Sequence, residues 1–107
     1  MVEPLTLPMP AECTLRTARA FKEDLSAALD GATVVLLDCA AIEHVDITFV
    51  QLVVAAARSS GRRGVTLDLT SPPKAVADAF RRAGFLPHHP FESASDATIG
   101  SPAAPAL

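Results

Sequence analysis

The residues of this chain that could do chemistry are few and widely spaced. The histidines are His44, His88 and His89, and the only thiols belong to Cys13 and Cys39. No further ligand stands near the histidine pair at the spacing of a zinc site, and the local sequence contains no Cys–His or Ser–His arrangement of a nucleophilic enzyme. We therefore expect a protein without enzymatic activity, metal or cofactor.

A more informative polar position lies at the start of the apolar segment 45–58. Asp46 precedes a run of aliphatic residues, and its carboxylate could accept a hydrogen bond from the backbone N–H of Thr48 or Phe49. A carboxylate at this place also interacts favourably with the positive end of the helix dipole. We predict that Asp46 is the N-cap of a buried helix whose first turn reaches the surface.

The composition is that of one globular domain with an aliphatic core. Half of the 107 residues are hydrophobic, whereas Trp and Tyr are absent. A net charge of −3 gives no reason to expect nucleic acid as a partner. The N-terminus lacks a signal-peptide pattern, and segment 45–58 is too short for membrane insertion. We expect a cytoplasmic protein whose cysteines are free thiols.

Apolar periodicity predicts three strands that alternate with three helices. Prolines flank the first strand, as in edge strands, whereas the second is a continuous apolar run that suits a central strand covered on both faces. This alternation predicts a single α/β domain with a small, mostly parallel sheet and helices packed against it. The predicted elements are strand 5–7, helix 14–29, strand 33–37, the helix from Asp46 to about Ser60, strand 64–69 and the helix from Ser71 to about Ala83.

Local signals predict how these elements begin and end. Thr14 is the expected N-cap of the first helix, Leu15 is placed on its apolar face, and Gly31 is expected to end it in the left-handed conformation. Ser71 is the expected N-cap of the third helix, and Gly84 follows its last turn. The domain is predicted to span 1–86. The remainder, 87–107, is predicted to be a largely irregular or disordered extension, with at most a short helical turn at 92–98.

The ordered series of segments resembles the STAS domain family, which comprises the anti-sigma factor antagonists and their relatives. In that family an apolar strand ends in Asp, and an Asp-Ser-Ser-Gly sequence or a close variant then opens a buried helix. The matching pieces here are the strand 34–37 with Asp38, the Asp-Ile-Thr-Phe sequence at 46–49, and the segments 64–67, 71–73 and 83–85. The resemblance covers about residues 5–86 and implies the same α/β fold.

The resemblance implies a non-enzymatic protein-interaction module in bacterial signalling. The residues expected to contact its partner are Asp46, Ile47, Thr48, Phe49 and Gln51. In the partner-switching branch of the family, a kinase that doubles as an anti-sigma factor phosphorylates the first hydroxyl after the aspartate. Ile47 occupies that position here and Phe49 replaces the usual glycine. These departures favour a divergent member, of the kind associated with chemotaxis or two-component signalling.

Several alternatives stay open at this point. Thr48 could be the phosphate acceptor of an anti-sigma factor antagonist, or it could bond locally within the first helical turn. Phe49 could pack in the core or serve as an exposed interface anchor. The chain could also be the STAS subunit of a lipid-transport ABC system and bind its ATPase. Binding of an apolar ligand, and a homodimer formed through the first strand, are compatible with the sequence as well.

Overall fold

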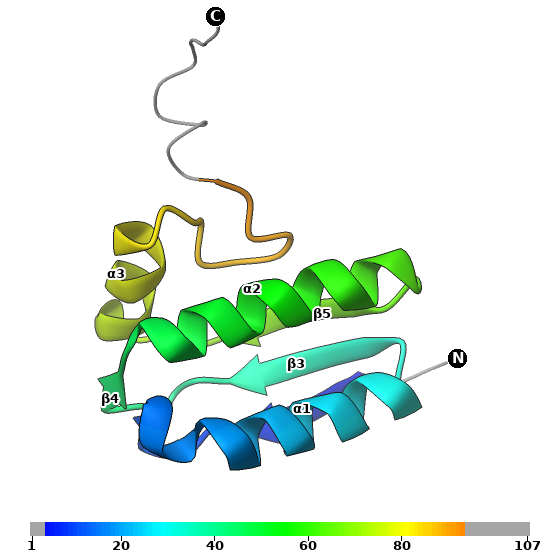
Figure 1. The fold of residues 1–107 in the computed structure, drawn as a ribbon, viewed down its shortest axis with the longest axis horizontal. Helices are drawn as coiled ribbons and strands as arrows, with labels where there is room; N and C mark the ends of the chain where they lie inside the picture. The colour runs from blue at the N-terminus through cyan, green and yellow to red at the C-terminus, as the bar shows by residue number, and fades with distance from the viewer. Residues whose placement is uncertain (1–3, 94–107) are drawn as a thin grey trace, which may run out of the picture.

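The computed structural model describes residues 4–93 and shows a two-layer α/β domain (Figure 1). Its main sheet has three parallel strands in the order β1-β3-β5, and α1 and α2 lie side by side over one face of that sheet. The strands are β1 (Leu5–Pro8), β3 (Val34–Asp38) and β5 (Thr66–Thr70), and the helices are α1 (Ala18–Gly31), α2 (Ile47–Arg62) and α3 (Lys74–Arg82). The predicted α/β fold, with its parallel sheet and its first strand at an edge, is confirmed.

A short second ribbon lies beyond the carboxyl ends of the main strands. It pairs β2 (Glu12–Cys13) with β4 (His44–Val45) in parallel, and the 3-10 turn η1 (Leu15–Thr17) follows β2. These three pieces were not predicted, because two-residue strands and single turns carry no hydrophobic period. They lie next to the start of α2, where Leu15 in η1 and Cys13 in β2 are hydrogen-bonded to Asp46.

The main sheet is covered by helices on one face only. In β3, Val35 and Leu37 are fully buried, whereas Val34 and Leu36 on the opposite face are half-buried. The prediction that this strand is covered on both faces was therefore wrong. The reason is topological: the chain moves in one direction from β1 to β3 to β5, and two right-handed crossovers in the same direction place α1 and α2 on the same side.

Two of the helices end in the same way, with a glycine in the left-handed conformation. Gly64 follows α2 with φ 79°, and the amide of Val65 donates to the carbonyl of Ser60 at 2.9 Å. Gly84 follows α3 with φ 93°, as predicted, and the next amide makes the equivalent bond back to the helix. Both endings are Schellman motifs, in which glycine avoids the steric cost of a positive φ.

The other predicted helix boundaries were wrong by four residues or fewer. Thr14 caps η1 rather than α1, which begins at Ala18. Gly31 belongs to α1 and has no positive φ, because the chain enters β3 directly through extended backbone. Ser71 is not an N-cap but has φ 51°. A residue before proline disfavours the helical conformation, so the Pro72–Pro73 pair delays α3 until Lys74.

The segment after α3 packs onto the domain as far as it is described. Phe91 is 2% exposed and stacks on Phe80 with ring centroids 5.6 Å apart. The amide of Leu86 donates to the carbonyl of Glu92 at 2.8 Å, and Phe85 forms an antiparallel bridge with Ser93. Most of the helical turn predicted at 92–98 lies outside the described residues. The domain boundary at residue 86 stays a prediction.

Candidate functional site

The first turn of α2 begins at the carboxyl end of the sheet, and Asp46 joins it to a neighbouring turn. The Oδ1 atom of Asp46 accepts a hydrogen bond from the amide of Thr48 at 2.9 Å, so the predicted N-cap is confirmed. The Oδ2 atom accepts a second hydrogen bond, also 2.9 Å long, from the amide of Leu15 in η1. One carboxylate therefore caps α2 and attaches η1 to it.

The η1 turn is held by its own threonines. The hydroxyl oxygen of Thr14 accepts a hydrogen bond from the amide of Arg16 at 3.2 Å, and the hydroxyl oxygen of Thr17 accepts one from the amide of Thr14 at 3.1 Å. The Thr14 hydroxyl also donates to Glu12 Oε2 at 2.7 Å. This reciprocal capping box fixes the backbone of Leu15, while its side chain is directed outward and is 71% exposed.

Two exposed apolar side chains therefore flank the Asp46 carboxylate. Leu15 donates its amide to Asp46, and Ile47, the next residue in the chain, is 50% exposed. Among residues 4–93, the only other large hydrophobic side chain that is exposed is Leu5, at the edge of the main sheet. Single exposed hydrophobic residues are ordinary, but a pair at a fixed helix start is the kind of feature that protein interfaces use.

The predicted site residues differ in their access to a partner. Gln51 lies one turn after Ile47 and is exposed, whereas Asp46 and Thr48 are half-buried. Phe49 is only 2% exposed, so the interpretation as an exposed anchor was wrong and the core-packing alternative holds.

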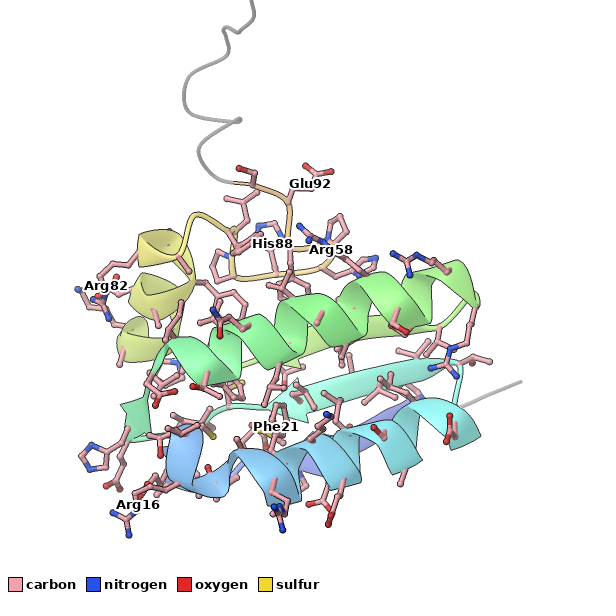
Figure 2. All side chains as sticks on the ribbon, in the orientation of Figure 1. Arg16, Phe21, Arg58, Arg82, His88 and Glu92 are labelled. Carbon is pink, nitrogen blue, oxygen red and sulfur yellow. The ribbon has the colours of Figure 1, made fainter. Side chains whose placement is uncertain are left out.

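The Phe49 ring lies inside a chain of aromatic contacts. Its centroid is 5.2 Å from that of Phe21 and 6.3 Å from that of Phe80. Phe21 points from α1 toward α2, which places these rings under the helix start (Figure 2). Phe49, which occupies the position of the usual glycine, therefore packs beneath the start of α2 and is not part of the exposed surface.

Charged groups of both signs lie around the helix start. A shallow surface depression there is lined by Leu15, Asp46 and His44, together with Arg16 and Glu12, whose Nε and Oε2 atoms are 3.6 Å apart. Arg16 points outward at this end of the molecule (Figure 2). The mixed charge gives no basic patch of the kind that binds a phosphate backbone.

On its other side, Thr48 faces the start of α1. It lines a second depression together with Arg19, Lys22 and Leu52, and Glu23 lies at the same depression. Neither Arg19 nor Lys22 forms an ion pair with any residue between 4 and 93. Two unpaired cations therefore lie near the only hydroxyl in the first turn of α2.

The two cysteine thiols are buried, and the carboxylate of Asp38 binds a backbone amide. Cys39 is fully buried and Cys13 is 4% exposed, and burial raises the pKa of their thiols to about 12 and about 11. Cys13 lies in β2. Asp38 accepts a hydrogen bond from the amide of Ala40 at 3.1 Å, as expected for a residue that satisfies donors at a strand end. Residues 4–93 contain no cluster of three or more His, Cys, Asp or Glu side chains able to hold a metal.

Leu15 is the site residue that the sequence interpretation missed. Its sequence position predicts the buried face of the first helix, because Leu15 continues the apolar spacing of Ala18 and Phe21. That spacing assumes an α-helix, whereas Leu15 lies in a 3-10 turn whose phase differs. The usable signal was the capping-box pair Thr14 and Thr17, which marks a separate turn before α1.

Comparisons with known proteins identify the family of the chain. No curated protein shows a significant match to it. No helix within the described part is both long and apolar enough to cross a bilayer. A family model described as "Mlab, STAS domain" matches residues 3–86, which include every helix and strand assigned within residues 4–93. STAS domains are generally non-catalytic interaction modules. The chain belongs to the STAS domain family.

Proposed function

We propose that this protein is a non-enzymatic STAS module that binds a bacterial signalling protein through the start of α2. The binding surface consists of Leu15, Asp46, Ile47, Thr48 and Gln51, and we refer to it as the α2 docking surface. The observation that carries the proposal is the double hydrogen bonding of Asp46, which attaches the backbone of exposed Leu15 to the helix start where Ile47 is also exposed.

The energetics of this surface favour a protein partner. Leu15 and Ile47 are apolar side chains whose burial by a partner would be favourable, at about 25 cal/mol for each Å² removed from water. The backbones of Leu15 and Ile47 are already fixed by η1 and by α2. Partner binding therefore costs little conformational entropy of the backbone. The surrounding charges include both signs, and they suit the polar rim of a protein interface better than a polyanion.

The proposal is tested by affinity capture with the full-length protein and mass spectrometry of what is retained. Wild type and the control Ala27→Asp, which adds the same charge at an exposed position on α1, should retain the same partner. Ile47→Asp and Leu15→Asp should each lose it, while the far-UV circular dichroism spectrum and melting temperature stay close to those of wild type. Equal retention by all four proteins would contradict the proposal.

The identity of the retained protein separates the proposed partner classes. A histidine kinase, response regulator or chemotaxis protein supports the signalling role. An anti-sigma factor with kinase activity points to the antagonist branch of the family, and the ATPase of a lipid transporter points to a transport subunit. Direct titration of the purified partner then checks that the contact does not need a third protein.

A phosphorylated form of the same surface is the second candidate, and one observation favours it. Thr48 lines a depression with Arg19 and Lys22, two cations that could pair with a phosphate on its hydroxyl. If the retained partner is a kinase, incubation with ATP should add one phosphate at Thr48, and Thr48→Val should abolish it. Phosphate at another residue, or none, would end this version and leave binding itself unaffected.

A further inference from the structure

A separate apolar pocket lies between the start of α1, α2 and the connection from β1 to β2. Its volume is about 180 Å³. The side chains that form its walls include Met9, Cys13, Ala18, Phe21, Phe49 and Leu52. Three of these, Met9, Cys13 and Phe49, are otherwise buried in the core, so the pocket reaches inward from the surface. It does not include Leu15 or Ile47 of the α2 docking surface.

The walls of the pocket suit an aromatic ring. Phe21 and Phe49 form one wall with their rings tilted by 34°. The sulfur atoms of Met9 and Cys13 are polarisable and make favourable contacts with aromatic rings. An engineered protein cavity of about 150 Å³ with a similar aliphatic and aromatic lining binds benzene. A volume of about 180 Å³ therefore has room for a small ring system, but not for a long acyl chain.

The polar groups at the pocket indicate the charge of the ligand. The hydroxyl groups of Thr14 and Thr17 already make hydrogen bonds, as acceptors from the amides of Arg16 and Thr14 and as donors to Glu12. Asp24 is the only charged residue among those that line the pocket in the described chain, and its carboxylate accepts no hydrogen bond from residues 4–93. A carboxylate repels an anionic ligand and accepts a hydrogen bond from an N–H or O–H group.

We propose that this pocket binds a small neutral aromatic molecule that carries one N–H or O–H donor, with the ring against Phe21 and Phe49 and the donor directed to Asp24. The site is distinct from the α2 docking surface and does not depend on the proposed function. Indole has the required size, neutral charge and single donor, and it serves as the probe.

The first experiment measures indole binding to the full-length protein by two-dimensional ¹H–¹⁵N NMR and by thermal melting. We expect saturable shifts of the amides of Cys13, Ala18 and Phe49, with a dissociation constant of about 1 mM or lower, as is usual for so small a ligand. At about five times that concentration the melting temperature should rise by about 4 °C. Absence of saturable shifts at these amides would overturn the proposal.

Matched ligands test the chemistry. Indole-3-carboxylate keeps the ring but adds a negative charge, and it should bind about twofold to fivefold more weakly because of the exposed Asp24 carboxylate. Asp24→Asn should remove most of that difference. Benzofuran has the same shape without the donor and should bind more weakly than indole. Equal affinity for indole, benzofuran and the carboxylate would contradict the proposed role of Asp24.

Matched variants test the location. Ala18→Leu adds three carbons to the pocket wall and should abolish the saturable shifts, whereas Ala27→Leu, on the same helix but outside the pocket, should bind indole as wild type does. Leucine is a good helix former, so both variants should fold, and their melting without ligand verifies this. Binding of indole to Ala18→Leu with wild-type affinity would place the ligand elsewhere and overturn the proposal.

Discussion

Apolar side chains are exposed to solvent at the N-terminal end of α2. Its C-terminal end instead has charged side chains and a glycine turn that leads into the next strand. At the first end, Asp46 orients exposed Leu15 and Ile47. At the second, Gly64 reverses the chain, and Arg63 pairs with Asp30 at the end of α1, with Nη1 and Oδ1 3.3 Å apart.

The arginines near the C-terminal end are accounted for by local contacts. Arg62 lies in the last turn of α2, where a cation interacts favourably with the helix dipole. The guanidinium of Arg58 lies 5.7 Å from the ring centroid of Phe85, and Arg58 points toward the segment after α3 (Figure 2). One helix can therefore have one end fixed by structural contacts and another end with exposed apolar side chains, and the second end is the better candidate for binding.

The largest expected effect is on the core beneath the docking end. Phe49→Ala removes a ring that contacts Phe21 and Phe80, and it should lower the free energy of unfolding by about 4 kcal/mol. Phe49→Leu keeps most of the volume and should cost about 1 kcal/mol. Urea denaturation followed by circular dichroism measures both. A loss below about 1 kcal/mol for the alanine variant would show that this end lacks the support described here.

The next effect concerns the carboxylate that distinguishes the docking end. Asp46→Ala removes the helix cap and the bond to η1, and it should lower the free energy of unfolding by about 2 kcal/mol, the sum of the two typical contributions. Asp46→Asn keeps a good cap and should cost about half as much. Hydrogen exchange at the Leu15 amide should accelerate in Asp46→Ala. Unchanged exchange there would mean that Asp46 does not hold η1.

At the C-terminal end of α2, we expect a substitution to change stability only through the backbone conformation of Gly64. Gly64→Ala places a side chain at φ 79° and should cost about 1 kcal/mol, although nothing lies within 4 Å of the added Cβ. Gly61→Ala is the matched control: it lies in α2 without a positive φ and with equal space, and it should be neutral or stabilising by up to about 1 kcal/mol. Thermal or urea unfolding compares them. Equal changes in the free energy of unfolding for the two variants would show that the positive φ of Gly64 carries no steric cost.

The smallest effect at neutral pH comes from the buried thiols near the docking end. Burial raises the pKa of Cys39 to about 12 and that of Cys13 to about 11, from 9.0. Below pH 9 both states of the chain keep these protons, so stability is unaffected. Above pH 9 the thiols of the unfolded state lose their protons before those of the folded state do. The free energy of unfolding should therefore fall as pH rises toward the folded pKa values.

Urea denaturation from pH 7 to pH 10.5 measures this fall. Cys39→Ala and Cys13→Ala should each weaken the pH dependence, and both thiols should react slowly with a disulfide reagent in the native protein at pH 8. A wild-type stability that rises between pH 9 and pH 10.5 would contradict the burial-based explanation.

The parts of the fold that follow from repeated patterns were predictable, and the parts that depend on single contacts were not. The parallel order of the strands follows from their alternation with helices, and the cap at Asp46 follows from the residues beside it. By contrast, the bond from Leu15 to Asp46 joins residues 31 positions apart, so no local pattern encodes it. The late start of α3 is an intermediate case, because Ser71 followed by Pro72 has the residue types of a helix start whereas the Pro72–Pro73 pair disfavours one.

The central claim is that Leu15 and Ile47 form one binding surface while the opposite end of α2 is structural. The most direct test is the dissociation constant of the captured partner for Leu15→Ala, Ile47→Ala and Gly64→Ala, each with its free energy of unfolding. The first two should weaken binding by about tenfold or more with stability changed by less than about 0.5 kcal/mol. Gly64→Ala should lose about 1 kcal/mol of stability and bind normally. Wild-type affinity in both alanine variants at the docking end would contradict the claim.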